Sequence, residues 1–139
     1  MTDAFDADVL IYAAVTGHPA GRRVRVLFGN AQAERYIGIG STLLLPELLT
    51  KPLRDGAHSE LLELGALLGR LDLRPVDDAT ARLAAALGAS YRLKAADAVH
   101  LATAVSVGAT RFITNNRKDF AADISEVQIT YPEDLPEPV

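Results

Sequence analysis

Cysteine and tryptophan are absent from the 139-residue sequence, and methionine occurs only once. Without cysteine the chain has neither a disulfide scaffold nor a thiol nucleophile, a composition that suits a reducing compartment. Only three histidines, His18, His58 and His100, could serve a metal that prefers softer ligands. A chain of this length can bury a core in a single domain without disulfides or a structural metal.

Long apolar runs are absent as well. No segment approaches the roughly 20 consecutive apolar residues that a bilayer-spanning helix needs. Residues 1–8 carry acidic side chains and do not resemble a basic leader. We therefore expect a cytoplasmic protein that makes no contact with a membrane.

Positive charge is in the minority, with 14 basic and 18 acidic residues and a formal net charge of −4. This balance argues against a protein that coats nucleic acid through a broad basic surface, because such binding gains its free energy from released counterions. A nuclease remains compatible with it, since single basic residues can meet phosphates locally. The candidates are Arg22, Arg23, Arg25, Lys51, Arg54, Arg92, Lys94, Arg117 and Lys118.

Short apolar runs alternate with longer helical patterns along the chain, which is typical of an α/β domain. Strands are expected at residues 4–6, 35–40, 71–76, 111–114 and 127–130. Helices are expected at residues 9–15, 20–31, 43–50, 59–71, 78–91 and 95–107. Ser41 or Thr42 can cap the third of these helices, and residues 53–56 form a turn. We expect a single domain over residues 1–131 and a mobile, proline-rich acidic tail over residues 132–139.

Four acidic residues, Asp6, Glu47, Asp97 and Asp119, each lie at the polar end of an otherwise apolar segment. Buried like charges repel each other and lose hydration, so carboxylates gathered on an apolar framework need a cation to neutralise them. Magnesium and manganese are the natural candidates, because both are hard ions that take oxygen ligands. The pattern therefore predicts an acidic site that binds Mg²⁺ or Mn²⁺.

Each acidic residue also has a purely structural explanation. Asp6, Asp8 and Asp97 could cap helices, and Glu47 could pair with Lys51 one helical turn later. Taken singly, these explanations are at least as good as metal binding, and only the joint occurrence of the acids favours a metal site.

His100 lies three residues after Asp97, on a neighbouring helical face, which raises the possibility of a general base. Its neighbours Val99, Leu101 and Ala102 are apolar. We therefore expect a buried or interface histidine that is held by a hydrogen bond.

Four segments contain the acidic residues in order: FDADVLI at residues 5–11, LPELL at 45–49, ADAVHLATA at 96–104 and FITNNRKDF at 112–120. In order and spacing this series resembles the motifs of PIN-domain ribonucleases. The third segment is the most specific of the four. The resemblance implies a PIN-like three-layer α/β fold, with a parallel central sheet and helices on both faces.

The same resemblance implies a divalent-metal-dependent endoribonuclease that cleaves RNA, of the kind found as VapC toxins in toxin–antitoxin pairs. Asp6, Glu47 and Asp97 match the three acids that hold metal in the family, and Asp119 matches the less regular fourth acid. Thr114 and Asn116 match polar positions near the same site, and together with Asp8 they form a secondary site.

One departure from the family pattern concerns Asn116, because many relatives have an acid at this position. A second metal would then be held weakly or not at all, and Asp8, at a position often filled by Asn or Ser, could compensate. Two divalent ions roughly 4 Å apart can activate a water and stabilise the leaving oxygen of a phosphodiester. Asp6 and Asp97 would be the principal ligands, with Glu47 and Asp119 acting directly or through water.

The resemblance also implies partners. A VapC-like toxin binds an antitoxin that inserts a segment near the acidic site, often with an arginine, and family members commonly form homodimers. The leucine-rich face of residues 61–71 and the helix that contains Tyr91 are the surfaces we expect to make such contacts.

Two other functions are compatible with parts of the sequence. Asp6-Ala7-Asp8 after a strand also resembles phosphatases of the haloacid dehalogenase type, but that assignment leaves Glu47 without a role and requires a catalytic lysine that the pattern does not place. The second is a PIN-like domain with an incomplete acid set that binds a protein partner and has lost catalysis. Cleavage of RNA, release of phosphate from small esters, or neither would separate the three.

Overall fold

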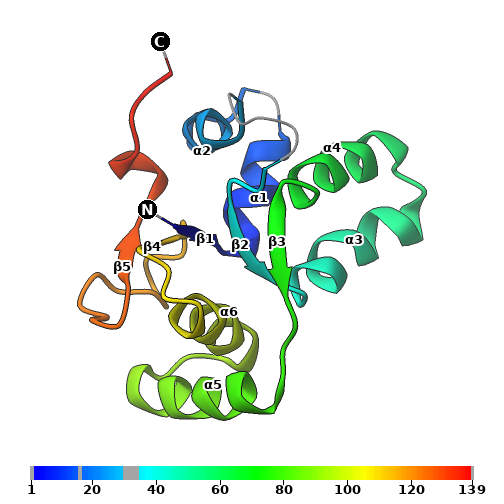
Figure 1. The fold of residues 1–139 in the computed structure, drawn as a ribbon. Helices are drawn as coiled ribbons and strands as arrows, with labels where there is room; N and C mark the ends of the chain where they lie inside the picture. The colour runs from blue at the N-terminus through cyan, green and yellow to red at the C-terminus, as the bar shows by residue number, and fades with distance from the viewer. Residues whose placement is uncertain (1, 16, 30–34, 139) are drawn as a thin grey trace.

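A five-stranded parallel sheet forms the centre of the computed structural model, which describes residues 2–15, 17–29 and 35–138 (Figure 1). The strands are β1 (Asp3–Phe5), β2 (Gly38–Ser41), β3 (Leu71–Arg74), β4 (Arg111–Ile113) and β5 (Gln128–Thr130). The helices are α1 (Ala7–Ala14), α2 (Pro19–Gly29), α3 (Leu44–Asp55), α4 (His58–Leu68), α5 (Asp78–Tyr91) and α6 (Ala95–Ser106), with a short 3₁₀ helix, η1 (Pro132–Asp134). The predicted α/β fold class is confirmed.

Helices cover both faces of the sheet, with α5 and α6 on one face and α1 to α4 on the other (Figure 1). Successive residues of a strand point to opposite faces, so β1 and β4 contribute to both cores. Ala4 and Phe112 are paired in register and pack under α5 and α6, whereas the next pair, Phe5 and Ile113, packs under the other helices. Each face of the sheet therefore has its own hydrophobic core.

The strand order β3-β2-β1-β4-β5 places β1 between β2 and β4. The chain builds the sheet outwards from β1 through β2 to β3, and then returns to the other side of β1 to add β4 and β5. The order therefore reverses between β1 and β4. In open parallel sheets the crevice beyond the carboxyl ends of two such strands is the usual position of a functional site.

Several predicted boundaries differ from the structure. The predicted turn at residues 53–56 is wrong in part, because α3 continues through Pro52 to Asp55 and ends at Gly56, whose φ of 64° is left-handed. Pro52 is buried, and its packing outweighs the backbone hydrogen bond that proline cannot make. Neither Ser41 nor Thr42 is the N-cap of α3: that position is Leu43, and Ser41 instead accepts a hydrogen bond from the Leu43 N–H at 3.0 Å.

The expected strand at residues 35–40 begins later, because β2 pairs with β3 only from Gly38 onward. The second helix begins at Pro19 and extends to Gly29, and the predicted end at Ala31 lies outside the described residues. The remaining helices and strands agree with the predictions to within a few residues, and α5 spans the predicted Asp78–Tyr91.

The segment after residue 131 makes specific contacts with α2. The Arg23 guanidinium donates to the carbonyl oxygens of Glu133 at 2.8 Å and Leu135 at 2.9 Å. The Leu135 side chain is 2% exposed and belongs to the same core as Phe5. Packing therefore continues to residue 135, and the predicted mobility of residues 132–139 stays a prediction. Within the described ranges, no helix is both long and apolar enough to span a membrane.

Candidate active site

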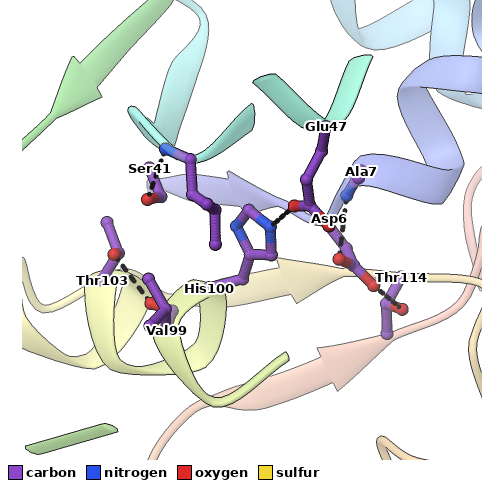
Figure 2. Close-up of polar contacts among 9 residues, drawn as sticks. Asp6, Ala7, Ser41, Glu47, Val99, His100, Thr103 and Thr114 are labelled. Carbon is purple, nitrogen blue, oxygen red and sulfur yellow. Dashed lines mark hydrogen bonds and ion pairs between the residues drawn. The ribbon is translucent and has the colours of Figure 1, made fainter. Parts of the chain in front are cut away.

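Asp6 lies at the reversal of strand order, directly after β1 and at the N-cap of α1. Its backbone N–H donates to the Ile113 carbonyl at 3.0 Å, which continues the pairing of β1 with β4. One carboxylate oxygen accepts the Ala7 N–H and the other accepts the Thr114 hydroxyl, both at 2.8 Å (Figure 2). Thr114 is fully buried and Asp6 is 5% exposed, so the carboxylate is held in one orientation inside the protein.

The capping alternative for Asp6 is thus correct, but it accounts for only one of the two carboxylate oxygens. Burial raises the pKa of Asp6 because it penalises the charged form, and the hydrogen bond from Thr114 offsets part of this effect. Such a carboxylate is costly to keep ionised unless a positive charge approaches it.

Asp97 lies in the first turn of α6 and is electrostatically coupled to Asp6. Burial, the charges of Asp6 and Asp119, and a side-chain hydrogen bond with Asp119 together raise the pKa of Asp97 to about 6. The helix has Lys94 at its N-cap position, so Asp97 is not the N-cap residue. Asp97 therefore lies within electrostatic reach of Asp6 and of Asp119, which come from two other segments of the chain.

Asp8 occupies the first turn of α1, within electrostatic reach of Asp6 and Asp97. Its carboxylate accepts the Asn115 N–H through both oxygens, at 3.3 Å and 3.2 Å. Burial and then the charge of Asp6 raise the pKa of Asp8 to about 7. Asn115 was not predicted as a site residue, and because it acts through its backbone no side-chain signal in the sequence could have found it.

Glu47 reaches the site from α3 and contacts His100 of α6 (Figure 2). The pair joins Glu47 Oε1 to His100 Nε2, so the alternative pairing of Glu47 with Lys51 is not the one formed. The charge of Glu47 contributes to the raised pKa of Asp6, so Glu47 lies within electrostatic reach of it. His100 is 2% exposed, as expected of a buried histidine, but its Nδ1 atom has no hydrogen-bond partner.

Asn116 and Asp119 form a closed pair in the loop after β4. The Asn116 side-chain amide donates to Asp119 Oδ2 at 3.0 Å, and the Asp119 N–H donates to Asn116 Oδ1 at 3.2 Å. The Asn116 N–H also donates to the Thr114 hydroxyl at 3.1 Å, which links this pair to Asp6. Asn116 therefore orients Asp119 through its side-chain amide.

The chemistry of these side chains fits a hard divalent cation. The potential metal ligands are carboxylate oxygens, burial and neighbouring acids raise the pKa of Asp6, Asp8 and Asp97, and in the described part of the chain no lysine or arginine forms an ion pair with the set. Within residues 2–15, 17–29 and 35–138, however, no three acidic, histidine or cysteine side chains lie close enough together to hold one ion. The carboxylates interact as pairs, and a shared site for Asp6, Glu47 and Asp97 stays a prediction.

Comparison with known proteins gives a consistent result. The family model described as "PIN domain" matches residues 4–124. No match is found to a protein with a curated description. A solved toxin–antitoxin complex from Klebsiella pneumoniae contains a chain that is 25% identical, with a TM-score of 0.71 over 95% of this chain and 98% of that one.

Two further solved structures share the fold at lower identity. DNA-bound VapBC from Salmonella typhimurium matches with a TM-score of 0.74 and 20% identity, over 95% of this chain and 98% of that chain. VapBC2 from Rickettsia felis, bound to a DNA fragment from its promoter, matches with a TM-score of 0.70 and 18% identity, over 94% and 98% of the two chains.

Proposed function

Since the chain belongs to the PIN domain family, whose model matches residues 4–124, we propose that it is a divalent-metal-dependent endoribonuclease. The observation that carries the proposal is the coupling of buried Asp6 with Asp97 at the reversal of strand order, without a lysine or arginine partner among the described residues. Two such carboxylates need a cation, and a cation among oxygen ligands is what phosphodiester cleavage requires.

In this proposal Asp6 and Asp97 hold Mg²⁺ or Mn²⁺, and Glu47 and Asp119 contribute directly or through water. An ion bound there would lower the pKa of an attacking water and stabilise charge on the leaving oxygen of the RNA. Glu47 would have to turn toward Asp6 to complete a three-carboxylate set, because the described side chains do not form one as they lie.

The residues around the acids keep them oriented. Thr114 holds one oxygen of Asp6, Asn116 holds Asp119, and His100 contacts Glu47. Because Asn116 is neutral where many relatives have an acid, any second ion is held less tightly, and Asp8 supplies an additional carboxylate on the same side. Groups that fix ligating carboxylates in this way tune metal affinity without touching the ion.

A cleavage assay tests the proposal. The purified protein should cleave RNA with Mn²⁺ or Mg²⁺, and excess chelator should abolish the activity. Asp97→Asn should be inactive, whereas Asp78→Asn, which removes an exposed carboxylate from α5, should remain active. RNA cleavage in excess chelator, or full activity of Asp97→Asn, would contradict the proposal.

The absence of a three-residue metal cluster among the described residues favours one other function, a PIN-like protein-binding module without catalysis. The same assay decides between them, because a module of that kind cleaves no RNA at any metal concentration. The phosphatase alternative loses its basis, since membership of the PIN domain family accounts for Asp6 without a catalytic lysine.

We further propose that the protein is the toxin of a VapBC-type pair, acts on RNA in the cytoplasm, binds an antitoxin protein and forms a homodimer. The 25% identity to a chain of the Klebsiella toxin–antitoxin complex supports the antitoxin partner. Expression of the active chain alone should arrest growth of a bacterial host, and co-expression with the protein encoded beside it should restore growth. Arrest that persists in Asp97→Asn would separate toxicity from nuclease activity, and a parent chain that causes no arrest would contradict the toxin assignment.

A further inference from the structure

A hollow of about 280 Å³ opens beside the acidic site, and Asp119 belongs to its wall. The other polar and aromatic residues that line it are Ser90, Tyr91, Arg92, Lys118 and Asp123. Asp119 is therefore common to this hollow and to the carboxylates proposed to hold metal.

Four of the nine basic residues that could meet phosphates are already engaged. Arg23 and Arg117 bind the C-terminal segment, Arg25 binds the Ala13 carbonyl, and Arg54 pairs with Asp55. The other five, Arg22, Lys51, Arg92, Lys94 and Lys118, are exposed and have no ion pair among the described residues, and of these Arg92 and Lys118 lie together. They are the two cations in the wall of the hollow that contains Asp119.

The backbone at Arg92 has an unusual conformation for this residue type. Arg92 follows α5 with φ 55° and ψ 44°, and it is the one non-glycine residue with positive φ among the described residues. Glycine is the residue that normally ends a helix in this left-handed conformation, because it has no Cβ to clash. An arginine with a strained backbone at a position that favours glycine is explained if its side chain has a functional role.

From these observations, and resting on the proposed nuclease function, we propose that Arg92 and Lys118 form a phosphate subsite for a second phosphate of the bound RNA strand. The two cations come from the end of α5 and from the loop after β4, and both line the hollow. They hold the strand where it passes Asp119, so that the adjacent phosphodiester lies at Asp6 and Asp97. Asp123 in the same wall repels the phosphate and limits its affinity.

The test measures RNA binding apart from cleavage. A fluorescein-labelled single-stranded RNA of random sequence is titrated with the full chain carrying Asp97→Asn, in chelator, and binding is followed by anisotropy at several salt concentrations. Arg92→Gly and Lys118→Ala are added to this background. Arg82→Ala is the matched control, because Arg82 is an exposed arginine of the same helix that pairs with Asp78 outside the hollow.

We expect Arg92→Gly and Lys118→Ala each to weaken binding roughly tenfold, as loss of a charged hydrogen bond does, and to reduce the slope of log affinity against log salt by about 0.7. Arg82→Ala should bind like the parent, and Asp123→Asn should bind more tightly. Arg92→Gly should not lower the thermal midpoint, since glycine relieves the left-handed strain, so lost binding could not be attributed to unfolding.

Equal affinity and equal salt slope in the parent, Arg92→Gly and Lys118→Ala would overturn the subsite, as would a parent that binds no RNA. Cleavage is measured separately in the chain with Asp97 intact. A chain that cleaves RNA but binds it independently of Arg92 and Lys118 disproves only the subsite. A chain that binds RNA through these residues but never cleaves it disproves only the nuclease.

Discussion

His100 Nε2 in α6 contacts the carboxylate of Glu47 in α3 across 53 residues of sequence. The imidazole is 2% exposed and its Nδ1 has no hydrogen-bond partner, so among the described residues the ring is held through its contact with Glu47. A carboxylate that is hydrogen-bonded through one oxygen keeps the other free for a ligand. We therefore expect His100 to act on the proposed metal site by positioning Glu47.

Replacement of His100 tests this positioning. His100→Leu should weaken Mn²⁺ binding about tenfold or more, the usual effect of removing a group that orients a metal ligand. His100→Gln should retain most of the affinity, because its amide can donate to Glu47 from a similar place. Calorimetric titration with manganese chloride measures both. Equal affinities in the three proteins would show that His100 only fills the core.

Asp97→Asn should abolish cleavage and leave the fold intact. In metal-free protein it should raise the free energy of unfolding at pH 8 by roughly 1 kcal/mol, because it removes one of several repelling charges that is only partly buried. Urea unfolding in chelator gives this difference, with Asp78→Asn as the control. A destabilised Asp97→Asn protein would instead indicate that the carboxylate has a structural role.

The raised pKa values of the site carboxylates should also make the stability of the protein depend on pH. Asp8 and Asp97 have pKa values raised to about 7 and about 6, so the folded protein binds more protons than the unfolded chain through this range. Stability from these groups is therefore complete below their unfolded pKa and is lost as pH rises through 6 and 7. The urea midpoint in chelator should fall between pH 5 and pH 8.

Asp8→Asn should flatten that decline, because asparagine does not titrate, and Mn²⁺ should restore stability most at the higher pH. The opposite trend, with a midpoint that rises from pH 5 to pH 8 in chelator, would show that the carboxylates are not mutually repelling in solution.

The loop after β4 offers a test of the second ion. Asn116→Asp should lower the manganese concentration needed for half-maximal cleavage, because it adds a charged oxygen ligand at the same chain length. Asp119→Asn should raise it. Cleavage is followed against manganese concentration in both variants and the parent. Superimposable curves would place Asn116 and Asp119 outside the metal site.

Leu135→Ala tests how far the folded domain extends. Leu135 is 2% exposed in a core shared with Phe5, so the substitution should destabilise the protein by about 2–5 kcal/mol, as for other buried leucines. Pro138→Ala, three residues further on, should leave the unfolding midpoint unchanged. A midpoint unaffected by Leu135→Ala would support a tail that is mobile from residue 132.

Local patterns in the sequence were sufficient for the order of helices and strands, and they singled out the acidic residues that are proposed as the site. Helix α5 could be predicted over Asp78–Tyr91 because its alanine-rich sequence favours a helix, and Asp77 caps it through the Thr80 N–H. The same local reasoning failed at Pro52, where the burial of one proline ring decided that α3 continues.

The contacts that make a site out of the acidic residues were decided by tertiary structure. Asp6 meets Thr114 across 108 residues because parallel pairing places Phe5 beside Ile113, and the residue after each strand then faces the other. Glu47 meets His100 because α3 and α6 converge beside β1. Composition and periodicity act over a few neighbouring residues, so they indicated which side chains carry charge. Strand register and helix packing act between distant segments, and they alone determined which of those charged side chains lie near one another.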